Sequence, residues 1–345
     1  MKTRITEMLG IQYPIFLSGM SWISTPEMVA AVSNAGGMGI LATGPLDKDA
    51  VREAVKKIRK LTDKPFGANS ALMFPGAAES AKVLLEEQVP VINFALGKGD
   101  WLVKEAHKYG GKVIATVVSS RHAKRAEEYG CDAVIATGNE AAAHGEFVTT
   151  FCLIPSLVNV LTIPVVAAGG IADGRGLAAA LALGAEGVAM GTRFMTTRES
   201  PLHQNYKDLS RTKDVTDTLY SKRFDGLYCR VLKTDTAKRV EQRGLDLPAA
   251  FVNGQDIAKM INLPFYKLMI GAALSGWKNA RQLAFLANAS KNFQRATEEG
   301  DLKRGVLPVG QCTGLVKDEP TVKEVIERMV KEAEGIEKKL AGVFN

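Results

Sequence analysis

The sequence has few cysteines, and their placement argues against two common kinds of site. Its 4 cysteines are scattered through 345 residues, and none belongs to a CxxC pair. Such a set is too sparse for a disulfide framework and has no zinc-binding spacing. We therefore expect a protein of a reducing compartment, the cytoplasm, without a bound metal.

Long hydrophobic segments and blocks of one charge are also missing. The stretch MKTRITEMLGIQYP lacks the apolar core of a secretory signal, and GLAAALALGAEGVAMG is short and interrupted by glycine. The formal net charge is +7, but Lys and Arg are interleaved with Asp and Glu along helical stretches. This pattern favours a solvated surface over nucleic-acid binding, and we expect no membrane partner.

Eight short apolar runs recur through the first two hundred positions, separated by helical-looking segments. Their starts lie roughly 20 to 31 residues apart, the length of one strand, one helix and two loops. Because the runs are apolar throughout, we expect parallel strands covered on both faces. The runs are 14–19, 38–43, 65–72, 90–96, 113–119, 133–138, 164–170 and 187–192.

This repeat predicts an α/β fold, the (β/α)8 TIM barrel, with a doubly wound open sheet as the alternative. After position 192 the alternation stops, and residues 201–304 are predicted to form a mostly helical insertion that covers the barrel mouth. We expect a cofactor-binding barrel at 1–200 and a C-terminal segment at 305–345 that returns to it. The amphipathic stretch 321–340 is the expected closing helix.

The active site of such a barrel lies at the carboxyl ends of its strands, so the residues that finish each run are informative. The seventh run ends in Gly169–Gly170 and the eighth in Gly191–Thr192. Glycines let backbone N–H groups approach an anion, and these two loops are the usual phosphate site of the fold. We favour the interpretation that these glycines bind the phosphate of a cofactor over the alternative that they only turn the chain.

Two earlier runs end in residues suited to a flat polar ring. The first run ends at Gly19, and Met20 and Ser21 follow it, so that the backbone there could lie against a flat ring. Asn69, in the third run, carries an amide that can both donate and accept hydrogen bonds. Otherwise Asn69 is a buried amide that needs other partners.

The most specific feature is the segment NEAAAHG, directly after the sixth run. It places His144 on a loop at the predicted catalytic face, preceded by small residues that leave room for a substrate. An imidazole there is suited to taking a proton near neutral pH. The alternative is a loop histidine that only caps backbone groups. No Ser-His-Asp order or metal-ligand cluster competes with it.

These segments resemble the nitronate monooxygenase family, formerly called 2-nitropropane dioxygenases, and its flavin-dependent enoyl-acyl carrier protein reductase relatives. The similarity covers almost the whole chain and implies an FMN-binding TIM barrel. It is carried by KTRITEMLGIQYPIFLSGMSW, LTDKPFGANSAL, NEAAAHGE, IPVVAAGGIADGRGLAAALALGAEGVAMGTRF and GVLPVGQCTGLV.

The resemblance also implies a role for individual residues, with His144 in the position of the catalytic histidine. The chain departs from the family at Ala142–Ala143, where two glycines usually precede the histidine, and at Thr137, where relatives often carry a polar amide or an acid. The implied FMN-binding residues are Gly19, Met20, Ser21, Asn69, Thr137 and Ala142, followed by Gly169, Gly170, Ala189, Met190, Gly191 and Thr192, most of the second group around the phosphate.

The activity implied first is that of an FMN-dependent nitronate monooxygenase, which oxidises alkyl nitronates or nitroalkanes with O2 to carbonyl compounds and nitrite. A second interpretation is an NAD(P)H-dependent FMN reductase acting on an enoyl-acyl carrier protein or a quinone. A third is a noncatalytic flavin-binding barrel. In the enzymatic interpretations the partner is a small-molecule substrate, and a homodimer is one assembly that the sequence leaves open.

Overall fold

The computed structural model describes residues 1–142 and 144–344, and eight parallel strands surround its centre. The ring closes between β1 and β2, because the Leu17 N–H donates to Met38 O and the Met38 N–H donates to Ile15 O, each at 2.9 Å. The (β/α)8 barrel is therefore confirmed. The strands are β1 (Ile15–Leu17), β2 (Gly39–Ala42), β3 (Phe66–Ala71), β4 (Val91–Ala95), β5 (Lys112–Val117), β6 (Ala133–Thr137), β7 (Val165–Ala168) and β8 (Gly187–Met190).

The strands are mostly shorter than the apolar runs that predicted them, and part of each missing stretch lies at the carboxyl end. The seventh strand ends at Ala168, and Gly169 and Gly170 follow with φ values of 112° and 76°. These values lie in the left-handed region that glycine adopts most readily. The seventh run, predicted as one strand to Gly170, therefore finishes as a glycine turn at the mouth of the barrel.

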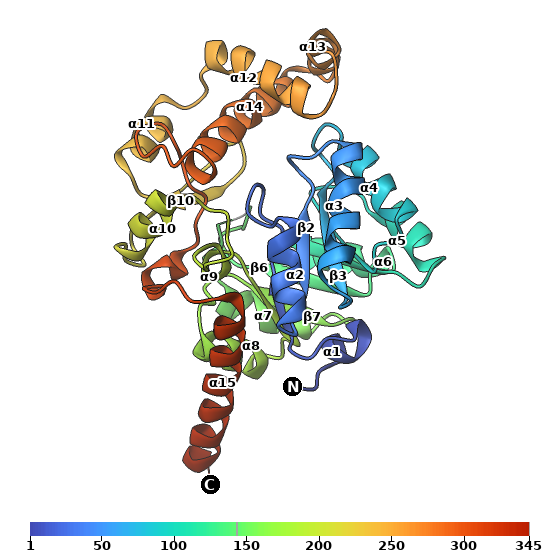
Figure 1. The fold of residues 1–345 in the computed structure, drawn as a ribbon, viewed down its shortest axis with the longest axis vertical. Coiled ribbons are helices and arrows are strands. Elements are labelled where there is room, and N and C mark those ends of the chain that lie inside the picture. Colours follow the sequence, from blue (N-terminus) through green and yellow to red (C-terminus); the bar gives the residue numbers. More distant parts are fainter. Residues whose placement is uncertain (143, 345) are drawn as a thin grey trace.

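Helices pack on the outside of the ring (Figure 1), one directly after each strand from β1 to β7 and one, α15, after the long segment that follows β8. The last of them, α15, packs against both α8 and α2 and so fills the eighth helical place. The short helix α1 (Arg4–Leu9) sends Ile5 and Leu9 into a core cluster with Phe16 and Met38. The outer helices are α2 (Pro26–Asn34), α3 (Lys48–Leu61), α4 (Ala77–Glu86), α5 (Asp100–His107), α6 (Ser120–Glu128), α7 (Thr150–Val158), α8 (Gly174–Ala182) and α15 (Val322–Phe344).

Between β8 and α15 the chain forms a further set of helices and a two-stranded antiparallel hairpin. The hairpin was not predicted, because its strands have only four residues each and no alternating apolar pattern. We call α12 to α14 the cap; it lies at the opposite end of the molecule from both chain ends (Figure 1). The elements are α9 (Thr192–Met195), α10 (Gln204–Arg211), β9 (Thr218–Ser221), β10 (Cys229–Leu232), α11 (Asp235–Arg243), α12 (Leu247–Met260), α13 (Phe265–Leu274), α14 (Trp277–Thr297) and the 3-10 helix η1 (Gln311–Leu315).

The division into a barrel, an insertion and a returning segment remains a proposal for the organisation of the chain.

Within the described residues, no single helix has the length and hydropathy to cross a membrane. Only α12 and α13 taken together do, and they are bent by 116° relative to each other.

Close packing of α2 on the barrel yields a prediction for Gly39→Ala. A Cβ at Gly39 would lie 2.7 Å from Val29 Cα and would overlap the Val29 carbonyl oxygen. We expect the free energy of unfolding to fall by about 1–3 kcal/mol, measured by urea denaturation followed by circular dichroism. The control is Gly271→Ala in α13, where the new methyl group meets open space. It should leave stability equal or slightly raised; equal stability of the two variants would contradict the packing.

Candidate active site

A cavity of about 1160 Å³ opens at the carboxyl ends of the barrel strands and extends beneath the cap. All 13 residues that the sequence predicted for the site line this cavity. Ala143, the second residue of the Ala142–Ala143 pair, lies outside the described residues. The residues brought together are Gly19, Met20, Ser21, Asn69, Thr137, Ala142, His144, Gly169, Gly170, Ala189, Met190, Gly191 and Thr192.

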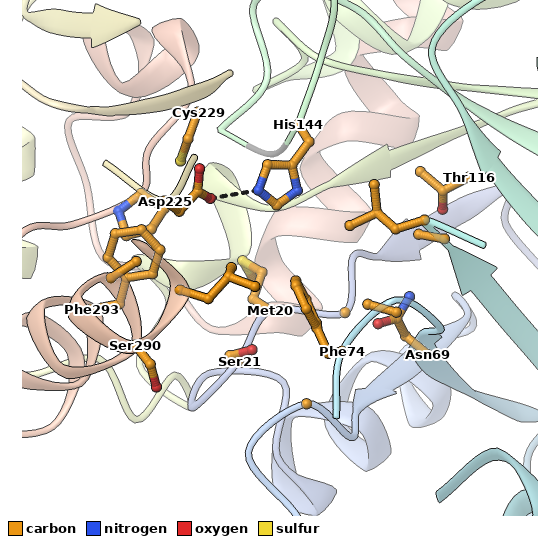
Figure 2. Close-up of a pocket in the computed structure, with 18 of the residues that line it drawn as sticks. Met20, Ser21, Asn69, Phe74, Thr116, His144, Asp225, Cys229, Ser290 and Phe293 are labelled. Atoms are coloured by element: carbon orange, nitrogen blue, oxygen red, sulfur yellow. Dashed lines mark hydrogen bonds and ion pairs between the residues drawn. The ribbon is translucent and has the colours of Figure 1, made fainter. Parts of the chain in front are cut away.

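His144 is paired with a buried acid from the insertion. Its Nε2 lies 2.6 Å from Oδ2 of Asp225, in the turn between β9 and β10 (Figure 2). The Asp225 side chain is 3% exposed and that of His144 is 27% exposed. The Leu227 N–H donates to Asp225 Oδ1 (3.0 Å), and Gln282 of α14 donates to the Asp225 carbonyl oxygen (2.7 Å). The acid is thus fixed from two further directions.

This pairing decides which ring nitrogen of His144 is free. An ionised carboxylate only accepts hydrogen bonds, so the neutral imidazole facing Asp225 carries its proton on Nε2. Nδ1 then keeps its lone pair and can take a proton from a ligand in the cavity. The arrangement is that of a general base oriented by a second group.

Asn69 is held by a chain of hydrogen bonds across three strand ends. Its Nδ2 donates to Asn93 Oδ1 (2.7 Å), and Asn93 Nδ2 donates to Thr116 Oγ1 (3.0 Å) and to Ile114 O (2.9 Å). The protein therefore supplies a partner for the amide nitrogen, while Asn69 Oδ1 is left as an acceptor for a ligand. A Cβ at Gly19 would lie 2.7 Å from Asn69 Cβ, so only glycine allows the first strand end to lie this close.

The ends of β7 and β8 present backbone to the cavity. Gly169 and Gly170 have consecutive positive φ values and no side chains, so a ligand can approach the backbone closely at the end of β7. A Cβ at Gly170 would lie 3.6 Å from Glu140 Cβ. Thr192 Oγ1 accepts a hydrogen bond from Gly310 N–H (2.9 Å) and so ties the end of β8 to the chain that returns from the insertion.

The cap forms an apolar wall opposite the strand ends. Two of the wall residues, Phe251 and Trp277, are 53% and 77% exposed, so the cavity opens to solvent between apolar side chains. In Figure 2, Ser290 and Phe293 of α14 lie beyond Asp225 and Met20, on the far side from Asn69. Apolar side chains of the wall include Leu247, Phe251, Ile257, Met260, Phe265, Leu268, Met269 and Trp277.

Sequence reasoning missed Asp225 and the apolar wall. Asp225 lies 81 positions from His144, in the segment SKRFDGLYC. Its only local signal is the Asp-Gly pair, which is typical of a hairpin turn and says nothing about catalysis. Its contact with His144 arises only from the tertiary fold.

Cys229 lies next to this acid, and its thiol is buried. Burial, with a smaller contribution from Asp225, raises the pKa of its thiol well above the ordinary value. Its Sγ lies 3.6 Å from the carbonyl oxygen of Ala142. Among the described residues, no cluster of three His, Cys, Asp or Glu side chains could hold a metal ion.

Comparison with known proteins agrees with the fold. A family model described as nitronate monooxygenase matches residues 2–83 and 76–332. The chain is 38% identical over 338 residues to a protein of Rhodococcus jostii (strain RHA1) named (3aS,4S,5R,7aS)-5-hydroxy-7a-methyl-1-oxo-octahydro-1H-indene-4-carboxyl-CoA dehydrogenase, covering 96% of each chain. A probable nitronate monooxygenase of Staphylococcus aureus (strain MSSA476) is 32% identical over 72% of this chain and 82% of that protein.

Among solved structures, FabK from Thermotoga maritima has 38% identity and a TM-score of 0.84, with 99% of each chain covered. The fold and these relatives define an oxidoreductase built on a TIM barrel. The chain belongs to the nitronate monooxygenase family.

The burial of the cysteines predicts their reactivity. Burial raises the pKa of Cys131 to about 12 and that of Cys312 to about 11, and Cys229 is shifted in the same direction, whereas Cys152 is exposed. Iodoacetamide at pH 8 should therefore alkylate Cys152 alone in the folded protein, since the thiolate is the nucleophile. Peptide mass spectrometry locates the label. Denatured protein, the control, should be labelled at all four positions; rapid native labelling of Cys229 would mean that the hairpin does not cover it.

Proposed function

We propose that this protein is an FMN-dependent oxidoreductase that acts on thioesters of bulky apolar acyl groups, with His144 moving the proton at the carbon next to the thioester carbonyl. The observation that carries the proposal is a large cavity that is apolar on its cap side and is lined by the His144 imidazole, which Asp225 orients. The sequence placed nitronate oxidation first. The size of the cavity favours the thioester interpretation, because a small nitroalkane would leave much of the apolar wall uncovered.

The proton chemistry belongs to His144 and Asp225. In the oxidative direction Nδ1 of His144 takes the proton from the α carbon, a hydride leaves the β carbon, and a carbon–carbon double bond forms. The Asp225 carboxylate stabilises the imidazolium that results. In the reductive direction the imidazolium returns the proton to the α carbon. FMN, when bound, would supply or accept the hydride in these reactions.

The residues at the strand ends fit FMN. At the Gly169–Gly170 turn no side chain would keep a phosphate away from the backbone, and Gly19, which has no room for a side chain beside Asn69, would let a ring approach that strand end. Asn69 Oδ1 offers an acceptor beside that surface. The part of the cavity that lies beneath the cap would then hold the acyl group.

The names of two relatives support the substrate class. The Rhodococcus jostii protein is named for the dehydrogenation of a bicyclic carboxyl-CoA, and the Staphylococcus aureus protein is named a probable nitronate monooxygenase. Oxidation of alkyl nitronates is therefore the second candidate. His144 would act as the base only on a neutral nitroalkane, which loses a proton from the carbon beside the nitro group, because a nitronate has already lost that proton.

The two functions are separated by anaerobic stopped-flow measurements on the FMN-loaded protein. We expect NADH or NADPH to bleach the flavin and enoyl-CoA thioesters to restore its colour. The kcat/KM should rise with acyl size, because each buried methylene stabilises binding by about 0.8 kcal/mol. Bleaching by alkyl nitronates alone, with no response to either nicotinamide or thioesters, would replace this function by nitronate oxidation.

The same assay tests the proposed base. His144→Gln should lower thioester turnover by about 10²–10⁴-fold while the Kd for FMN stays within twofold, because the imidazole moves a proton and does not hold the cofactor. Asp225→Asn should act in the same direction, since the amide disturbs the ring tautomer. The matched control is His107→Gln, at an exposed histidine of α5 that does not line the cavity. Full turnover by His144→Gln would remove the base role.

The glycine turn gives a separate prediction for cofactor affinity. Gly170→Ala places a methyl group at a residue with φ 76°, beside the proposed phosphate position. The Kd for FMN, measured by fluorescence titration, should rise about tenfold because the backbone must shift away from the phosphate. Gly110→Ala is the control, since Gly110 has φ 82° and open space around it but lies outside the cavity. An equal effect of both substitutions would mean general destabilisation.

A further inference from the structure

The loop that carries His144 is held from outside the barrel by the β9–β10 hairpin. We call residues 138–149 the His144 loop; it joins β6 to α7. Besides the Asp225 contact, the hairpin reaches the loop through Tyr220 and Arg230, one from each strand. These two residues are directly opposite one another in the hairpin register.

Tyr220 holds the loop immediately after His144. Its hydroxyl donates to the Gly145 carbonyl oxygen at 2.6 Å. Burial raises the pKa of Tyr220, so the hydroxyl stays protonated and remains a donor. The ring stacks on Tyr228 with centroids 5.1 Å apart, and Phe147 packs edge-on against both rings. The Tyr220 ring therefore belongs to an aromatic cluster that joins the hairpin to Phe147 of the His144 loop.

Arg230 holds the loop on the other side of His144. Its backbone N–H donates to Ala142 O (3.2 Å), and its guanidinium donates to Asn139 O from Nε (3.1 Å) and Nη2 (2.9 Å). Nη2 also reaches Asn139 Oδ1 (2.8 Å). The guanidinium lies over the Tyr220 ring, 4.8 Å from its centroid.

Arg230 is an unusual choice for a purely structural contact. The residue is 6% exposed, and no carboxylate pairs with it among the ion pairs of the described residues. Burial lowers the pKa of its guanidinium. A buried cation costs free energy unless its N–H groups are satisfied, and here they are satisfied mainly by the backbone and side chain of Asn139 in the His144 loop.

We propose that Tyr220 and Arg230 are positioning residues that fix the backbone on both sides of His144, so that the imidazole meets Asp225 and turns Nδ1 toward the cavity. The described residues of this loop form no helix or strand, and ordering each residue costs about 1–2 kcal/mol. The hairpin contacts offset this cost at Ala142 and Gly145. The inference rests on the proposed role of His144 and adds residues that do not line the cavity.

The test of positioning is a double-mutant cycle with Tyr220→Phe and His144→Gln, using thioester turnover. Tyr220→Phe removes one hydrogen bond and keeps the ring. We expect kcat to fall about 5- to 20-fold while KM stays within twofold. In the His144→Gln background the same substitution should have no further effect, since there is no imidazole left to position. An equal loss in both backgrounds would overturn the proposal.

A second measurement does not depend on turnover. In protein labelled with 15N-histidine, the chain has only 4 histidines, and the His144 signal is assigned as the one lost in His144→Gln. We expect Tyr220→Phe and Arg230→Lys to shift or broaden that imidazole signal, because lysine keeps the charge but loses the planar fork. The control Tyr228→Phe changes a tyrosine of the same aromatic cluster and should leave the signal in place.

Thioester turnover and the imidazole signal together distinguish a failure of the base role from a failure of the positioning role. If His144→Gln keeps full activity while Tyr220→Phe still moves the imidazole signal, the base role is wrong and the positioning stands. If neither Tyr220→Phe nor Arg230→Lys moves the signal, the positioning is wrong whatever the activity of His144→Gln. Thermal unfolding of each variant, expected to stay within a few degrees of the parent, shows that the comparison is between folded proteins.

Discussion

The backbone hydrogen bonds between the first strand and Met38 close the ring of parallel strands, and a closed ring gathers every carboxyl strand end around one mouth. Residues as distant in sequence as Gly19, Asn69, His144 and Gly170 meet there. No local motif could bring them together. The cavity, the proposed cofactor position and the reach of the cap all follow from that closure.

The second level of organisation is the meeting of the barrel with its insertion. The barrel contributes an imidazole on a loop without regular structure, and the insertion contributes a buried carboxylate on a hairpin turn. A carboxylate with so little exposure is stable only when it is hydrogen-bonded, and Asp225 has partners in His144 and Leu227. The proposed chemistry therefore depends on a contact between the barrel and the insertion, two segments that lie far apart in the sequence.

Much of the barrel could be predicted from sequence, because each strand buries both faces and so appears as a continuous apolar run. The glycines at 169–170 and the loop histidine were also predictable, since the fold assigns a position to each strand end. The hairpin could not be predicted, because Thr218–Ser221 is only half-buried and has no strand pattern. Asp225 and Arg230 were missed for a related reason: their roles come from side-chain contacts about 80 to 90 positions away.

The acid and the apolar wall share one continuous stretch, from β9 to the end of α14, while the imidazole stays with the barrel. Grafting that stretch from one family member onto another would transfer pocket shape and acid together. A graft limited to the cap helices would alter the pocket and keep the native acid, but it would replace the helix whose Gln282 bonds to the turn. The position at which a graft begins therefore decides whether the acid is exchanged together with the apolar wall.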